Sequence, residues 1–287
     1  MKSRAARGYN DQRKGRLDLT AWRCAMESGQ LLRHSMYASL LLTTCLAGNA
    51  LADEFSYNGD HGPGFWSETP GWEACGRTTE PGARQTPIDI NDTVADPHLR
   101  RLDLHILETE ISLINNGHSI EQEYENGSEL TLNGAVYELQ QFHFHTLSEH
   151  TVHGHRGVME QHAVFKNLNT GAMAVVAVLY ELGHSNRFLD RLIDAGLPPK
   201  SGDETHSSHF IDLADGLTDT GSYYTYAGSL TTPPCSETVT WFVLKHPATV
   251  SKAQFKTFNH ILGNDFRPLQ ERNGRVVRST VGHDHDD

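Results

Sequence analysis

Residues 141–145 have the sequence Gln-Phe-His-Phe-His, and residues 160–162 have the sequence Glu-Gln-His. In a β-strand, side chains two positions apart lie on one face, about 6.6 Å apart, so His143 and His145 can bind one ion while Phe142 and Phe144 face the core. His162 follows His145 by 17 positions, enough for a turn and a neighbouring antiparallel strand to return a third imidazole to that face. Three neutral imidazoles leave a tetrahedral zinc ion with one open position. The pattern predicts a catalytic site with Zn2+ as cofactor.

Polar residues near these histidines favour a metal site over a chance pair. A half-exposed strand can carry two histidines at this spacing without binding a metal, so the pair alone decides little. A zinc-bound histidine normally donates its other ring N–H to a carboxylate or a carbonyl. Gln141 and Glu160 each precede a proposed ligand by two positions. We therefore expect them to orient His143 and His162.

A second segment, residues 226–237, has the sequence YAGSLTTPPCSE and is followed by Val239-Thr240-Trp241. Together the two segments resemble the α-class carbonic anhydrases, in particular the exported bacterial type. The resemblance covers roughly Phe55 to Ser279. It includes Tyr57, His61-Gly62-Pro63, Trp66, residues 85–90 (QTPIDI), residues 115–118 (NNGH) and Arg267-Pro268.

The resemblance implies a fold and an activity. The fold is mainly β with peripheral helices, built on a large twisted, mostly antiparallel central sheet with zinc at the base of a conical cleft. The activity is the zinc-dependent reversible hydration of carbon dioxide to bicarbonate and a proton by a zinc-bound hydroxide. The implied partners are carbon dioxide, bicarbonate and water. The sequence does not decide between a monomer and a homodimer.

The resemblance also implies roles for single residues. Thr231 would accept the hydroxide proton and donate its own to Glu149, because a carboxylate only accepts. His118, with an unperturbed pKa near 6.5, would carry protons through waters ordered by Tyr57 and Asn116. The implied substrate pocket consists of Val164, Val175, Leu230, Thr232, Val239 and Trp241. From sequence alone the apolar members are equally compatible with plain core, and His118 with a surface turn. Glu121, on the same segment as His118, receives no definite role.

The N-terminal region predicts export. Arg33-His34 precede an apolar run from Met36 to Leu46, and Ala50-Leu51-Ala52 is a small-x-small cleavage site, a pattern typical of a secretory signal peptide. We assign residues 1–52 to a leader and residues 53–287 to a single catalytic domain. The expected location is periplasmic or secreted.

Two alternatives to a cleaved signal peptide are less favoured. A membrane anchor would need about 20 apolar residues to span, and the run is shorter. A lipoprotein site at Cys45 would need smaller residues before the cysteine. The polar stretch before the apolar run is long for a signal peptide, so translation could also start at Met26 or Met36.

Charge and cysteine content agree with export. The 287 residues carry a formal charge of −12, and residues 53–287 hold 16 basic and 33 acidic residues, a net charge of −17. This acidity argues against nucleic-acid binding, which needs a basic surface. Outside the leader only Cys75 and Cys235 remain. We expect them to form a disulfide in an oxidising compartment, as in similar bacterial family members; two buried free thiols are the alternative.

Short alternating or apolar runs predict strands at residues 111–114, 129–132, 136–139, 172–180 and 239–244. Asn-Gly pairs predict hairpin turns at residues 116–117, 126–127 and 133–134. Helices are expected at residues 185–195, with Ser185 as N-cap, and at residues 251–262.

Two rival functions fit the sequence less well than a carbonic anhydrase. A cupin shares the His143-x-His145 spacing with Glu149 four residues on, but the glycine spacing around that motif is absent. A non-catalytic binding module on the same fold would lack one or more of the zinc histidines, and all three positions are filled here. His150 is expected to be a hydrogen-bonding core residue rather than a ligand.

Overall fold

The computed structural model describes residues 55–125 and 127–281, so the predicted leader lies outside it. The longer strands in this part of the chain are β4 (Thr109–Asn115), β5 (Ile120–Glu123), β6 (Glu129–Leu132), β7 (Ala135–His145), β10 (Met159–Lys166), β11 (Met173–Leu182), β12 (Glu204–Ile211), β13 (Tyr223–Gly228) and β14 (Val239–Leu244). The shorter strands are β1 (Asp89–Ile90), β2 (Val94–Ala95), β3 (Asp103–His105), β8 (Thr151–Val152), β9 (His155–Arg156), β15 (Ala248–Val250) and β16 (Arg278–Ser279). The α-helices are α1 (Arg187–Ala195) and α2 (Lys252–Leu262), and the 3-10 helices are η1 (Gly59–His61), η2 (Trp66–Glu68), η3 (Glu73–Gly76) and η4 (Leu213–Gly216).

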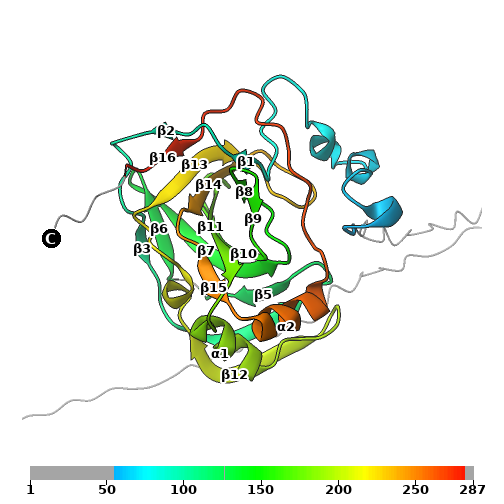
Figure 1. Cartoon of the computed structure of the whole chain (residues 1–287), viewed down its shortest axis with the longest axis vertical. Helices are drawn as coiled ribbons and strands as arrows, with labels where there is room; N and C mark the ends of the chain where they lie inside the picture. Colours follow the sequence, from blue (N-terminus) through cyan, green and yellow to red (C-terminus); the bar gives the residue numbers. More distant parts are fainter. Residues whose placement is uncertain (1–54, 126, 282–287) are drawn as a thin grey trace, which may run out of the picture. The chain divides into compact units, whose positions relative to one another are not determined.

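Most of these strands form one large twisted sheet (Figure 1). Within the described residues its order is β12-β4-β5-β7-β10-β11-β14-β13-β16-β2, and β1, β8 and β9 form a small separate sheet. In the large sheet, β11 is parallel to β14 and β15, and β16 is parallel to β2, whereas the other pairs are antiparallel. A parallel pair needs a long crossover, and the chain between β11 and β14 passes through α1, β12 and β13. The predicted fold class is confirmed, with a sheet that is mixed but mostly antiparallel.

The Asn-Gly pairs give two different outcomes. Asn133 and Gly134 form the two-residue turn between β6 and β7, with φ of 49° and 79°. A type I′ turn requires positive φ at both positions, which these two residue types tolerate best. The pair at 116–117 lies in the turn between the antiparallel strands β4 and β5. Asn126 lies outside the described residues, but the strands on either side of it, β5 and β6, each pair with β7, so the hairpin predicted at 126–127 is wrong.

The two α-helices begin at side-chain caps. Ser251 caps α2 in a capping box with Gln254, which satisfies two backbone N–H groups at once. In α1 the N-cap is Asn186, whose side chain accepts a hydrogen bond from the Phe188 N–H. The prediction of Ser185 as cap is wrong by one residue, because both types suit a cap and the Ser185 hydroxyl donates to Asp190 instead.

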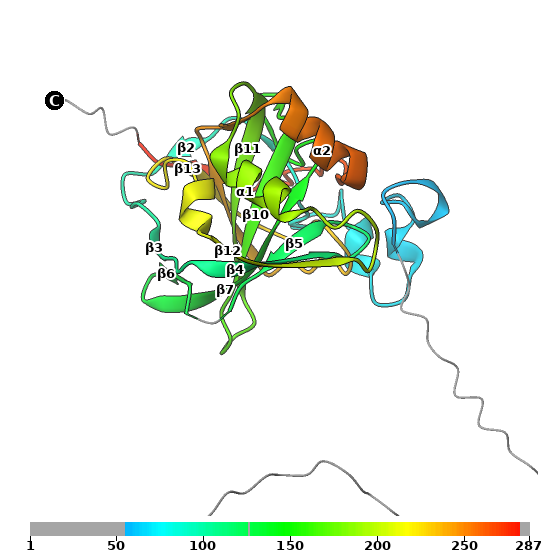
Figure 2. The same cartoon turned by 90° about the horizontal axis from the view of Figure 1, so that it is seen from below.

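Strand β7 separates the apolar core from the candidate site. Phe142 and Phe144 are fully buried on the core face of this strand. The Phe142 ring contacts Phe188 of α1 and the Phe144 ring contacts Phe258 of α2. The two helices therefore cover this side of the sheet, and both views show them next to one another (Figures 1 and 2). His143 and His145 alternate with the phenylalanines and lie on the opposite face, as the period of two requires.

The segment that precedes the sheet is held by aromatic contacts and a disulfide. Phe55, Tyr57 and Trp66 have ring centroids 5.4–5.9 Å apart in edge-to-face arrangements. Cys75 and Cys235 form a disulfide that joins this segment to the chain after β13. Among the described residues, no helix has the length and apolar character needed to cross a membrane.

Candidate active site

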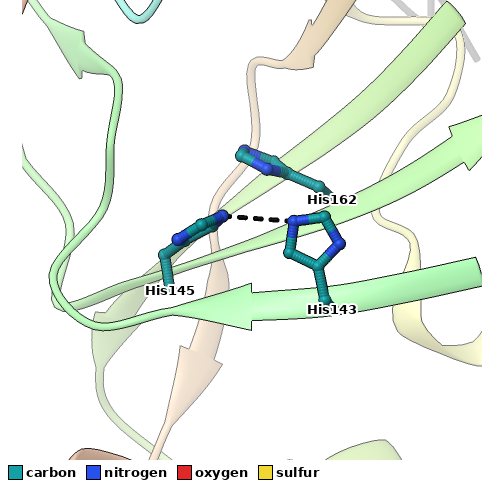
Figure 3. A group of neighbouring side chains, drawn as sticks. All are labelled: His143, His145 and His162. Atoms are coloured by element: carbon teal, nitrogen blue, oxygen red, sulfur yellow. Dashed lines mark hydrogen bonds between the residues drawn. The ribbon is translucent and has the colours of Figure 1, made fainter. Parts of the chain in front are cut away.

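Three imidazoles converge on one face of the central strands (Figure 3). His143 and His145 come from β7, and His162 is the direct cross-strand neighbour of His143 on β10. One ring nitrogen from each histidine lies within 4.8 Å of the others. The Nε2 atoms of His143 and His145 are 3.2 Å apart, a separation that needs a proton or a cation between two such nitrogens. The three residues can therefore hold a metal ion.

Each imidazole is oriented through its second nitrogen. His143 donates from Nδ1 to the Gln141 Oε1 at 2.8 Å, and His162 donates from Nε2 to the Glu160 Oε1 at 2.8 Å. These contacts leave Nε2 of His143 and Nδ1 of His162 with free lone pairs toward the centre, since the acceptor fixes the tautomer. Gln141 and Glu160 thus lie where the sequence places them.

Sequence reasoning missed the partner of the third imidazole. His145 donates from Nδ1 to the backbone carbonyl of Asp265 at 2.7 Å, across 120 residues of sequence. The Asp265 side chain accepts from the Thr146 N–H at 2.6 Å, which fixes the end of β7 on this loop. A backbone carbonyl in a distant loop produces no periodic pattern in the sequence. The only sequence feature that indicated this loop was the family resemblance at Arg267-Pro268.

Burial favours the neutral, metal-binding form of the histidines, and the nearby carboxylates oppose it at His145. Burial lowers the pKa of His143 well below its ordinary value, and the neighbouring His145 adds to this effect. For His145 burial acts in the same direction, but the carboxylates of Glu149 and Asp265 outweigh it and raise the pKa. Burial itself raises the pKa of the Asp265 carboxyl to about 7.

Glu160 is shared between two histidines. It is fully buried, and burial alone would raise its pKa, but His150 and His162 outweigh that effect and lower the pKa well below the ordinary value. Its Oε1 also lies 2.6 Å from Nδ1 of His150, and Nε2 of His150 lies 2.6 Å from the Tyr226 hydroxyl. His150 is thus a hydrogen-bonding core residue, as expected.

Glu149 is fully buried beneath the histidines. Its Oε1 accepts from the Arg267 N–H at 2.8 Å, and its Oε2 lies 3.7 Å from the His145 Nε2. This Oε2 has no hydrogen-bond partner within the part of the chain that the structure describes. Thr231 is 6% exposed and lines the cavity above. The expected Thr231–Glu149 hydrogen bond stays a prediction. The oxygen that would accept it, Oε2 of Glu149, is unpaired among the described residues.

The cavity in front of the histidines has a volume of about 210 Å³. Five members of the implied substrate pocket line it: Val164, Val175, Leu230, Thr232 and Trp241. Val239 belongs to the same buried apolar cluster but is not among the lining residues, so its part in the substrate pocket stays a prediction. Phe55 and Met173 also line the cavity and were not foreseen from sequence.

His118 lies half-buried on the wall of the same cavity, together with Tyr57 and Asn116. Its ring stacks on Phe55 with centroids 3.7 Å apart and an interplanar angle of 13°. The Tyr57 hydroxyl is buried without a partner among the described residues, and burial raises its pKa well above the ordinary value. Asn116 is engaged on both sides: Oδ1 accepts from the backbone N–H groups of His118 and Ser119, and Nδ2 donates to Glu121.

The sequence that carries these histidines and this cavity is similar to known proteins. Residues 61–281 match the family model of eukaryotic-type carbonic anhydrases. The chain belongs to the α-carbonic anhydrase family. A carbonic anhydrase of Klebsiella pneumoniae is 41% identical over 243 residues, which cover 84% of this chain and 96% of that protein.

Solved structures agree with this membership. The α-carbonic anhydrase of Photobacterium profundum is 41% identical with a TM-score of 0.72, covering 78% of this chain and 100% of that one. A dioscorin complexed with ascorbate is 32% identical with a TM-score of 0.72, covering 79% and 97%. The predicted enzyme class, a carbonic anhydrase, is confirmed, and family membership supports carbon dioxide hydration as its reaction.

Proposed function

We propose that this enzyme catalyses the zinc-dependent reversible hydration of carbon dioxide to bicarbonate and a proton. The observation that carries the proposal is the convergence of His143, His145 and His162, each with its outer nitrogen held by a protein acceptor. Three nitrogen donors with one position left open are the donor set of a catalytic zinc site. A zinc ion bound there would lower the pKa of a water to about 7, the value established for this class of enzyme.

Thr231 and Glu149 orient the attacking oxygen. The Arg267 N–H occupies Oε1 of Glu149, so Oε2 is the acceptor left for the Thr231 hydroxyl. A carboxylate accepts only, which makes Thr231 a donor toward Glu149 and an acceptor toward the cavity. The Thr231 hydroxyl oxygen can then accept the proton of an attacking O–H group. This hydrogen bond directs a lone pair of the attacking oxygen toward carbon dioxide.

An apolar wall receives the substrate. Carbon dioxide carries no charge, so it is placed by shape and by exclusion of water rather than by a charged side chain. Val164, Val175, Leu230 and Trp241 supply that wall next to the three histidines. Thr232 is the polar member of the same wall and can donate to bicarbonate.

His118 carries the released proton out of the cavity. An imidazole titrates near neutral pH, and His118 lies on the cavity wall that also holds the zinc ligands. Tyr57 offers its buried hydroxyl to the intervening waters. Both the Oδ1 and the Nδ2 of Asn116 already form hydrogen bonds within the protein, to the His118 N–H and to Glu121. Asn116 therefore acts by fixing the turn that carries His118.

Hydration measured on zinc-loaded and chelator-treated protein tests the function. Activity should disappear with the metal and return on adding zinc, because a water forms hydroxide at neutral pH only when a bound cation lowers its pKa. A His143→Ala variant is the matched protein control, since it removes one ligand from an otherwise unchanged cavity. Zinc-replete protein without hydration activity would refute the proposal and favour the binding-module alternative.

Export places the enzyme in the periplasm or outside the cell. The Cys75–Cys235 disulfide supports an oxidising compartment, and the N-terminal pattern supports cleavage after Ala52. Residues 53–287 would then be the single catalytic domain. Intact-mass analysis of the exported protein should show Asp53 as its first residue; a retained leader would contradict this assignment.

A further inference from the structure

Glu121 is the one carboxylate among the residues that line the active-site cavity of the described chain. It lies on β5 directly opposite His143 on β7. No lysine or arginine lines the same cavity; its other titratable members are Tyr57, His118 and the three zinc-site histidines. The wall therefore carries one acidic group and no permanently cationic side chain.

The carboxylate of Glu121 is held in a defined position. Its Oε1 accepts from Asn116 Nδ2 at 2.7 Å and from Ser119 Oγ at 3.1 Å. The Asn116 amide is itself fixed, because its Oδ1 accepts from two backbone N–H groups of the following turn. These two donors stabilise the ionised carboxyl and partly oppose the burial that raises the pKa of Glu121.

Substrate and product differ in charge. Carbon dioxide is neutral, whereas bicarbonate is an anion. A fixed negative charge on the cavity wall raises the energy of an anion nearby and leaves a neutral molecule almost unaffected. The effect acts at short range inside a partly desolvated cavity, where salt screens it weakly.

We propose that Glu121 is a specificity-determining residue that disfavours anions in the cavity and so promotes release of bicarbonate. This inference rests on the proposed function, because it concerns the product of that reaction. Inorganic anions that compete for the same cavity are held weakly for the same reason. Glu121 acts by its charge on the cavity wall.

A charge-neutral variant tests this role. Glu121→Gln keeps the size and both hydrogen bonds to Oε1 but removes the charge. With the protein loaded with Co2+, thiocyanate binding is followed by visible absorption. The variant should bind thiocyanate about fivefold more tightly, equivalent to about 1 kcal/mol. In steady-state assays the KM for bicarbonate should fall by a similar factor, and the KM for carbon dioxide should not change.

Glu123→Gln is the matched control. Glu123 lies two residues further along β5, is exposed, and does not line the cavity. This variant loses the same charge and should keep wild-type thiocyanate affinity. Glu121→Asp retains the charge and should stay within twofold of the wild type, which separates a charge effect from a packing effect.

Two results would overturn the inference. One is thiocyanate affinity in Glu121→Gln equal to that of the wild type, and the other is an equal gain in Glu123→Gln. A failure of the proposed function is recognised separately: wild-type protein would then bind Co2+ and thiocyanate but hydrate no carbon dioxide. The absorption titration needs no turnover, so the two failures are distinguishable.

Discussion

Removing the Cys75–Cys235 disulfide should destabilise the enzyme substantially. The bridge joins positions 160 residues apart, and the chain-entropy model assigns a loop of that length about 5 kcal/mol of stability at 25 °C. Both half-cystines are almost fully buried beside Trp66, so the packing is lost together with the cross-link. The unfolded chain keeps some compactness, which reduces the entropic part. We expect Cys75→Ala/Cys235→Ala to lower the free energy of unfolding by about 3–5 kcal/mol.

Urea unfolding followed by tryptophan fluorescence measures this difference. The experiment compares oxidised wild type, reduced wild type and the double variant, all with chelator present, because a bound metal would stabilise the folded state by mass action. Reduced wild type should resemble the double variant, which controls for the alanine side chains. A loss below about 1 kcal/mol in both would refute the loop-entropy reasoning.

Three further outcomes follow from the site, and a fourth follows from Tyr180, which is fully buried in the core on β11. Thr231→Ala should retain zinc but lose about 100-fold in kcat/KM for hydration because the attacking oxygen is no longer aimed; wild-type activity in zinc-replete protein would exclude Thr231 from the mechanism. Glu160→Gln should weaken zinc binding by about 10–100-fold in chelator competition, and unchanged affinity would contradict its orienting role. His118→Ala should slow turnover in dilute buffer by about tenfold or more and regain rate with added imidazole, whereas a variant equal to wild type would make His118 a surface residue. Burial raises the pKa of Tyr180. The unfolded tyrosine ionises near pH 10, so the stability that burial of the neutral phenol contributes is complete below pH 10 and declines above it. Tyr180→Phe should therefore make the fall in the free energy of unfolding above pH 10 less steep by about 1.4 kcal/mol per pH unit.

The strand-borne part of the site could be predicted from sequence because its geometry is periodic. His143 and His145 share a face through the period of two, and the Asn133-Gly134 turn fixes where β7 begins. His162 pairs with His143 because β10 runs antiparallel to β7. The outer acceptor Gln141 follows from the same period, and so does the position of Glu160.

The loop-borne part could not be predicted from residue patterns. The Asp265 carbonyl and the Arg267 N–H reach His145 and Glu149 across about 120 residues, and backbone groups of loops carry no sequence pattern. Val239 shows a second limit: it lies in one buried cluster with Val164, Val175 and Trp241, but it is not among the residues that line the cavity, and its role stays a prediction. Whether a strand residue faces a cavity or the layer behind it depends on neighbouring side chains from other strands.

The hydrogen bonds that orient the three imidazoles also bear on when the enzyme receives its metal. Acceptors supplied by the protein, namely the Gln141 side chain, the Asp265 carbonyl and the Glu160 carboxylate, orient the rings. Under the proposed export, a polypeptide that arranges its ligands in this way would complete its fold outside the membrane and take up zinc there. The quantity of working catalyst would then follow environmental zinc availability as well as gene expression, and inactive protein would be a reserve that zinc alone converts to active enzyme.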